Sequence, residues 1–200
     1  MTRARLEAFS DAVIAIIMTI MVLELSIPHG HEWKHLGPLV PKFLVYLLSF
    51  VFLGIYWSNH HHLIATTKRV HGGVLWANLH LLFWLSLTPF VTGWMGENDF
   101  APEPTAAYGI VMLLSAIAYY ILQSVILASH EPDAPLRAAL GRDLKGKLSP
   151  VLYAAAIPLA FVNAWIAVGL YVFVALMWLV PDRRIEALFA AEAVDAPPTL

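Results

Sequence analysis

Residues 5–25 read RLEAFSDAVIAIIMTIMVLEL, a mostly apolar stretch that opens with charged residues. About 20 apolar residues are enough to cross the hydrocarbon core of a membrane as a helix. Two features are unusual for such a helix. Arg5, Glu7 and Asp11 fall close together at its start, and Thr19 stands alone among isoleucines and methionines. These polar positions are the first candidates for a functional role.

The composition places the whole chain in the membrane class. Apolar residues make up 60% of its 200 residues and charged residues 13%, whereas soluble domains have roughly 45–50% apolar and about 25% charged residues. The first apolar segment begins with acidic residues and ends without a small-residue cleavage pattern, so we expect a retained helix rather than a signal peptide. The sequence has no cysteine, which excludes disulfides and thiolate metal sites.

The apolar blocks predict an all-α integral membrane protein with six transmembrane helices and both termini in the cytoplasm. The last block, 148–180, is too long for one crossing and is divided near Asn163. Six spans keep most Lys and Arg on the cytoplasmic side, whereas five would place Arg183 and Arg184 outside. The predicted helices cover about 6–27, 40–64, 74–95, 105–129, 148–163 and 165–180. They form one domain, 1–182, followed by a short cytoplasmic tail, 183–200, and residues 130–146 are expected to include a short surface helix.

The first predicted helix has one broad apolar stripe. At 100° per residue the stripe contains Ala12, Ile16, Thr19, Ile20, Leu23 and Ile27. From periodicity alone, packing against a neighbouring helix is the commoner explanation of such a stripe. Asp11 is harder to explain, because a carboxylate at a helix centre costs about 2.5–3.5 kcal/mol on the insertion scale. Arg5 and Asp11 are not an i,i+4 pair, so we expect the partner of Asp11 on another helix or subunit.

The start of this helix resembles a known family. Arg5, Phe9, Ser10 and Asp11 form an RxxxFSD motif, which is similar to the signature of the transmembrane protein 175 family of potassium channels. The resemblance continues through AVIAIIMTIMVLE (12–24), YWSNHHHLI (56–64) and NLHLLFWLSLTPF (78–90), and covers essentially the whole chain.

The resemblance implies a prokaryotic channel of four identical subunits, with the pore lined by the first helix of each. It places the narrow aliphatic ring at Ile16 and a hydroxyl layer at Thr19, with Ile20 and Leu23 as further rings. It also implies that Arg5, Phe9, Ser10 and Asp11 hold the pore helix by meeting polar residues of the second and third helices. The matching positions there are Trp57, His60, His61 and Asn78.

The predicted function is a potassium-selective, leak-type channel, a multi-pass protein in the cell membrane of a prokaryote. The sequence has no TVGYG stretch, so the expected constriction is hydrophobic rather than a filter of backbone carbonyls. The expected partners are further copies of the chain and membrane lipid, with no nucleic acid and no cofactor beyond permeant potassium. A weakly selective cation channel, a small proton-coupled transporter using Asp11 and the membrane histidines, and a membrane scaffold remain open alternatives.

The histidines and Glu24 complete the set of candidates. Three adjacent histidines, 60–62, point in different directions on a helix and are not joined by an HExxH motif, so neither a metal site nor an enzyme is expected. Glu24, at the outer end of the first helix, either attracts cations to the mouth of the pore or pairs with Lys34 or Lys42.

Overall fold

The computed structural model describes residues 1–67, 69–129 and 144–179. Within these ranges every regular element is a helix, so the all-α prediction is confirmed for this part of the chain. The predicted tail at 183–200 and most of the predicted surface helix lie outside the described residues. The elements are α1 (Arg3–Ile20), η1 (Met21–Glu24), η2 (Trp33–Leu39), α2 (Val40–Ala65), α3 (Gly72–Ser86), α4 (Thr88–Glu97), α5 (Pro102–Leu127), α7 (Leu144–Val162) and α8 (Ala164–Leu179), where η marks a 3-10 helix.

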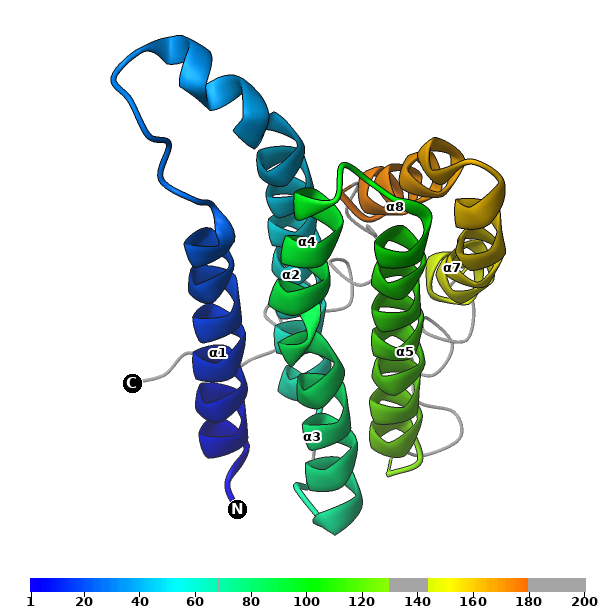
Figure 1. Cartoon of the computed structure of the whole chain (residues 1–200). Coiled ribbons are helices and arrows are strands. Elements are labelled where there is room, and N and C mark those ends of the chain that lie inside the picture. The colour runs from blue at the N-terminus through cyan, green and yellow to red at the C-terminus, as the bar shows by residue number, and fades with distance from the viewer. Residues whose placement is uncertain (68, 130–143, 180–200) are drawn as a thin grey trace.

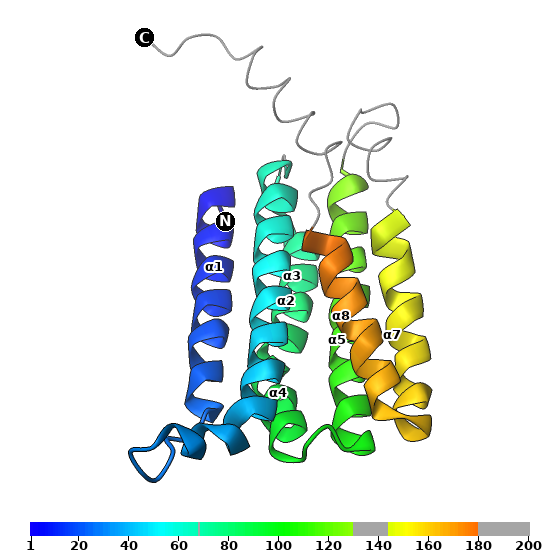
Figure 2. The same ribbon diagram turned by 90° about the horizontal axis from the view of Figure 1, so that it is seen from above.

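The helices stand side by side, with α1 at one edge of the molecule and α7 and α8 at the opposite edge (Figure 1). Seen from above, the start of α1, the ends of α2 and α5 and the start of α7 share one end of the bundle (Figure 2). We call this the α1-start end. Among the described residues, four helical segments are long and apolar enough to cross a membrane: Arg3–Glu24, Trp33–Ala65, Gly72–Glu97 and Pro102–Leu127. Ala164–Leu179 is a shorter apolar helix.

The first helix is shorter than the predicted span 6–27. It begins after Thr2, whose Oγ1 accepts a hydrogen bond from the backbone N–H of Arg5 at 3.3 Å, and it remains α-helical only to Ile20. The chain then tightens into η1, a common way for a helix to satisfy its last carbonyls. In a 3-10 helix residues three apart lie above one another, so this tightening places Leu23 above Ile20.

The predicted third span, 74–95, is two helices in the structure. The chain breaks at Leu87, between α3 and α4. Pro89 lies in the first turn of α4 and explains the break, because proline has no N–H to donate and its ring clashes with the carbonyl four residues earlier. The fourth span was predicted to begin at 105, but α5 begins three residues earlier, at Pro102, a residue suited to the first turn of a helix.

Two apolar clusters fill the bundle. One joins residues of α1, α2, α3 and α5, and the other joins residues of α2, α4, α5, α7 and α8. The helices α2 and α5 contribute to both clusters and form the centre of the molecule. Near the second cluster, α7 and α8 meet at Asn163, whose Oδ1 accepts a hydrogen bond from the backbone N–H of Trp165 at 2.9 Å. The edge helix α1 is therefore held from one side only.

Candidate functional site

The buried side of α1 is joined to α2 and α3 by a chain of hydrogen bonds. Ser10, His60 and Asn78 are each 0% exposed. The Ser10 hydroxyl donates to the carbonyl of Leu6 at 2.9 Å, and Asn78 Nδ2 donates to Ser10 Oγ at 2.9 Å. Asn78 Oδ1 lies 2.7 Å from His60 Nε2. We call Ser10, His60 and Asn78 the α1 cluster.

The direction of these bonds fixes the histidine tautomer. A carbonyl only accepts, so the Ser10 proton is used on Leu6 and the Ser10 oxygen must accept from the Asn78 amide. The Asn78 oxygen is then left to accept, which requires a proton on His60 Nε2. In the part of the chain that the structure describes, His60 Nδ1 is buried without a partner. The imidazole is therefore held by Asn78 alone.

Two contacts lie beside the α1 cluster and also reach α2. Trp57 Nε1 donates to Asp11 Oδ1 at 3.0 Å, so the structure gives Asp11 its partner on another helix. His61 Nδ1 lies 2.7 Å from Glu7 Oε1. Glu7 was not among the predicted site residues. Its spacing of four residues before Asp11, which places both carboxylates on one side of the helix, was the available signal.

The arginines differ from the expectation. Within the described residues Arg5 makes a hydrogen bond only through its backbone N–H, and its side chain is exposed. Arg3 instead donates from Nη1 to the carbonyl of Ala65 at 2.8 Å, which satisfies a terminal carbonyl of α2. Phe9 is 46% exposed and faces away from the α1 cluster's buried interior.

The opposite side of α1 is an exposed apolar stripe. Ile16 is 56% exposed, Ile20 42% and Leu23 77%. Thr19 is exposed between them, and its hydroxyl donates to the carbonyl of Ile16 at 2.9 Å. That bond uses the hydroxyl proton and leaves the oxygen lone pairs directed away from the helix. We call Ile16, Thr19, Ile20 and Leu23 the α1 stripe.

The segment that follows η1 is joined to α2, and α2 is joined there to α4. Lys42 Nζ lies 3.0 Å from Glu97 Oε1 and 3.3 Å from Ser26 Oγ. Lys34 pairs with Glu32 at 2.7 Å. Among the described residues neither lysine pairs with Glu24, so that alternative for Glu24 is wrong. The side chain of Glu24 instead lies against Gly93, where a Cβ atom would approach Glu24 Oε2 to 2.8 Å.

A second buried polar cluster escaped the sequence analysis. Ser49 Oγ lies 2.7 Å from Thr92 Oγ1 and 3.1 Å from Tyr108 Oη, joining α2, α4 and α5. Beside it, the Tyr171 hydroxyl donates to the carbonyl of Thr105 at 3.0 Å. We call Ser49, Thr92 and Tyr108 the central cluster. Single hydroxyl residues scattered over several apolar helices form no motif, so the sequence carried no signal for it.

The histidine run does not form a metal site in the part of the chain described here. No group of three or more His, Asp or Glu side chains is close enough to hold a metal ion there. His60 points into the α1 cluster, while His61 and His62 are exposed with their ring centroids 5.5 Å apart. The three imidazole rings therefore lie in different surroundings.

These features define an all-α membrane protein whose first helix has one side joined to the bundle by polar contacts and the other side bare and apolar. Residues 5–89 match the family model described as the endosomal/lysosomal potassium channel TMEM175. A potassium channel from Chryseobacterium sp. (strain P1-3) is 53% identical over 186 residues, which cover 93% of this chain and 97% of that protein. A potassium channel from Streptomyces collinus is 31% identical over 187 residues, covering 87% of this chain and 90% of its own length.

The fold leads to the same family. The crystal structure of a lysosomal potassium-selective channel TMEM175 homologue from Chamaesiphon minutus superposes with a TM-score of 0.74 at 27% identity, over 89% of this chain and 96% of that one. The chain belongs to the TMEM175 family. The resemblance stated from the RxxxFSD motif is thus confirmed. The family and these relatives are ion channels rather than enzymes, as the sequence predicted.

Proposed function

We propose that this chain is the subunit of a potassium-selective, leak-type cation channel in the cell membrane of a prokaryote. Four copies surround the pore, with the α1 stripe of each facing the axis. The asymmetry of α1 carries the proposal. Its polar residues face α2 and α3, while the apolar α1 stripe is exposed on the single chain. A membrane helix at the edge of a bundle that is fixed on one side is suited to lining a space shared by several copies.

The α1 stripe supplies the elements of a hydrophobic gate. A ring of Ile16 side chains narrows the pore and closes it by expelling water, since an ion that enters an apolar ring loses hydration without compensation. Potassium sheds water more easily than sodium, so such a ring favours potassium. Thr19 lies one turn further and offers hydroxyl oxygens as a ligand layer, because its proton is already bonded to Ile16. Ile20 and Leu23 form further apolar rings.

The proposed topology has six crossings and both termini in the cytoplasm. The two halves of the last apolar block, α7 and α8, supply the fifth and sixth crossings after the four longer segments. The α1-start end then faces the cytoplasm, where Arg3, Arg69, Lys145 and Lys147 satisfy the positive-inside rule. On this proposal the polar contacts of Ser10, Asp11, Trp57, His60, His61 and Asn78 keep α1 in place while the gate moves.

The test is single-channel recording from the purified full chain in a planar bilayer, with potassium on one side and sodium on the other. We expect discrete current steps with a reversal potential displaced towards potassium. Ile16→Asn should raise conductance roughly tenfold and reduce selectivity, a change equivalent to lowering the barrier by about 1.4 kcal/mol. Ile110→Asn is the matched control, because Ile110 is 44% exposed on α5, away from the α1 stripe.

Each alternative gives a different record. Steps that reverse near zero would indicate a weakly selective cation channel. Slow, saturable uptake that follows a proton gradient would indicate a transporter, although the structure joins Asp11 to Trp57 rather than to a histidine. If the protein transported no ion at all, a membrane scaffold would be the remaining alternative. If Ile16→Asn had the conductance and selectivity of the wild type, Ile16 would not form the gate.

A further inference from the structure

A groove runs between α1 and α4, along the first helix. It has a volume of about 680 Å³, and Val13, Ile16, Ile17 and Ile20 line its α1 side. Binding sites for small ligands usually measure about 300–1,000 Å³. We call this space the α1–α4 groove. Because Ile16 and Ile20 also belong to the α1 stripe, a molecule that fills the groove touches that stripe.

The α4 wall of the groove is aromatic. Phe90 and Trp94 lie one turn apart on α4, and their ring centroids are 6.0 Å apart with the ring planes inclined by 32°. Phe90 is 64% exposed and Trp94 39%, so both rings are open to a ligand. Aromatic rings pack against apolar chains, and their faces also attract ammonium groups. This wall therefore suits a ligand that carries both an apolar chain and a positive charge.

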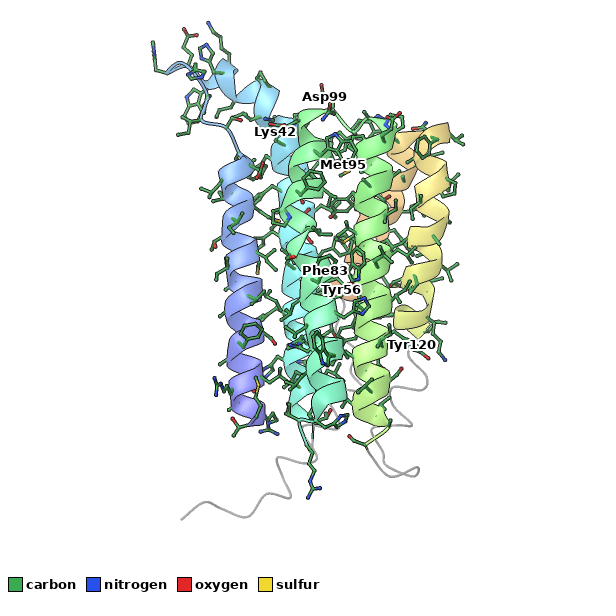
Figure 3. All side chains as sticks on the ribbon, turned by 60° about the horizontal axis from the view of Figure 1, so that its bottom comes forward. Lys42, Tyr56, Phe83, Met95, Asp99 and Tyr120 are labelled. Atoms are coloured by element: carbon green, nitrogen blue, oxygen red, sulfur yellow. The ribbon has the colours of Figure 1, made fainter. Side chains whose placement is uncertain are left out.

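The groove is acidic at one end. Glu24 of η1 and Glu97, the last residue of α4, line it there. Lys42 Nζ lies 3.0 Å from Glu97 Oε1 and neutralises that carboxylate, whereas Glu24 has no ion-pair partner among the described residues. Figure 3 shows Lys42 and Asp99 at this end of the bundle, with Phe83 nearer the middle. One carboxylate charge is therefore left uncompensated at the acidic end.

Gly93 leaves room for the Glu24 carboxylate at the edge of the groove. A Cβ atom at Gly93 would lie 2.8 Å from Glu24 Oε2 and 3.3 Å from Glu24 Cδ, so a side chain at this position would displace the carboxylate. The Glu24 side chain thus reaches from η1 to α4. Trp94 follows Gly93 in the chain and also lines the groove, so the charge and the aromatic wall lie close together.

A second copy of the chain matches the acidic end poorly. The α1 stripe that such a copy presents is uncharged. The lysines of the segment after η1 are already paired within the chain, Lys34 with Glu32 at 2.7 Å and Lys42 with Glu97. Covering Glu24 with uncharged side chains would take a carboxylate out of water without a partner, which is costly. A ligand with a positive charge removes that cost.

We propose that the α1–α4 groove binds a single-chain cationic amphiphile from the membrane. Its ammonium head lies between Glu24 and Trp94, and its alkyl chain runs along Ile20 and Ile16 towards Val13. The α1 wall from Val13 to Glu24 is about 18 Å long at the rises of an α-helix and a 3-10 helix, so an alkyl chain fits along it. On the proposed topology the acidic end faces the outer leaflet. That placement rests on the proposed function, whereas the binding itself does not.

The test is native mass spectrometry of the full-length protein purified in dodecyl maltoside. Dodecyltrimethylammonium and its uncharged analogue dodecyldimethylamine oxide are added at equal concentrations. We expect the assembled protein to retain the ammonium at least tenfold more tightly than the amine oxide, and Glu24→Gln to abolish this preference. The matched control is Glu103→Gln, which removes an exposed carboxylate from the first turn of α5, outside the groove lining, and should keep the preference.

The aromatic wall has its own matched pair. Phe90→Ala should lower retention of the ammonium at least tenfold. Phe83→Ala removes a ring that is 55% exposed on α3, outside the groove lining, and should retain the ammonium like the wild type. This pair carries the test if Glu24→Gln fails to give an assembled protein on gel filtration.

Three results would overturn the proposal. The wild type could retain the ammonium and the amine oxide equally, or Glu24→Gln and Phe90→Ala could both retain the ammonium like the wild type. Retention by single chains but not by the assembled protein would show that a second copy fills the groove. Because the measurement detects bound mass rather than current, a protein that conducts no potassium would contradict the proposed function and leave this test intact.

Discussion

The α1 cluster and the central cluster solve the same physical problem in different parts of the molecule. Both bury polar side chains from three helices in apolar surroundings, and both pair them with one another. The central cluster lies in the body of the bundle, where α2, α4 and α5 are also packed by a large apolar core. The α1 cluster joins an edge helix that has neighbours on one side only.

The difference shows how an exposed helix can be held firmly. The apolar residues that α1 gives to the core are few, and the α1 stripe gives it none. In a membrane, apolar contact with lipid replaces apolar contact with protein at little cost, so packing alone fixes a helix poorly. A directional chain of hydrogen bonds fixes both the rotation and the height of α1. The same chain sets the direction of the α1 stripe, in which Ile16 and Ile20 line a groove shared with α4.

Removing Asn78 should produce the largest effect. Asn78→Leu leaves His60 without any partner among the described residues and takes one bond from Ser10, at an expected cost of about 2–4 kcal/mol. The melting temperature of the purified protein, followed by tryptophan fluorescence, should fall by about 2–4 °C for each kcal/mol. Conductance should change as well, because α1 loses its orientation.

The matched control for this change is Asn98→Leu. Asn98 is exposed just after α4, and within the described residues its side chain donates one hydrogen bond, to the carbonyl of Trp94 at 2.8 Å. Its loss should cost less than about 1 kcal/mol and leave conductance unchanged. If Asn78→Leu melted like Asn98→Leu, the α1 cluster would not be what holds the first helix.

The two clusters also differ in what the sequence revealed. The family resemblance that begins at the RxxxFSD motif and continues through 56–64 and 78–90 implied that the first helix meets the second and third, and the structure places Trp57 against Asp11 and Asn78 against Ser10. Ser49, Thr92 and Tyr108 are isolated, and only the folded structure brings them within hydrogen-bonding distance. Helix ends were missed where backbone geometry decides them, at the 3-10 turn after Ile20 and at Leu87 before Pro89.

In the body of the bundle, added side-chain volume should lower the stability of the protein. A Cβ atom at Gly109 would collide with the hydroxyl of Tyr171, which is 0% exposed and bonded to the carbonyl of Thr105. Gly109→Ala should therefore cost about 1–3 kcal/mol. The measurement is again the melting temperature, with conductance expected to match the wild type because the site does not touch α1.

Gly169→Ala is the control for crowding. Nothing lies within 4 Å of the Cβ position at Gly169, which is also helical. Alanine there should stabilise the protein by about 0.5–1 kcal/mol through helix propensity. A Gly109→Ala protein as stable as Gly169→Ala would mean that Tyr171 moves freely, and that the body of the bundle is less rigid than its buried contacts indicate.

The contact between Glu7 and His61 should have the smallest effect of those on α1. The two side chains are 23% and 52% exposed, so solvent weakens their attraction, and such pairs contribute about 0.2–1 kcal/mol. Glu7→Gln keeps an oxygen that can accept from His61 and should lower the melting temperature by only a few degrees. Glu32→Gln, which alters a pair of the same 2.7 Å length away from α1, is the matched control and should have no effect on conductance. If Glu7→Gln destabilised the protein as much as Asn78→Leu, the contact between Glu7 and His61 rather than the buried amide of Asn78 would anchor α1. Burial of polar groups would then not be what the α1 cluster and the central cluster have in common as a means of fixing helices.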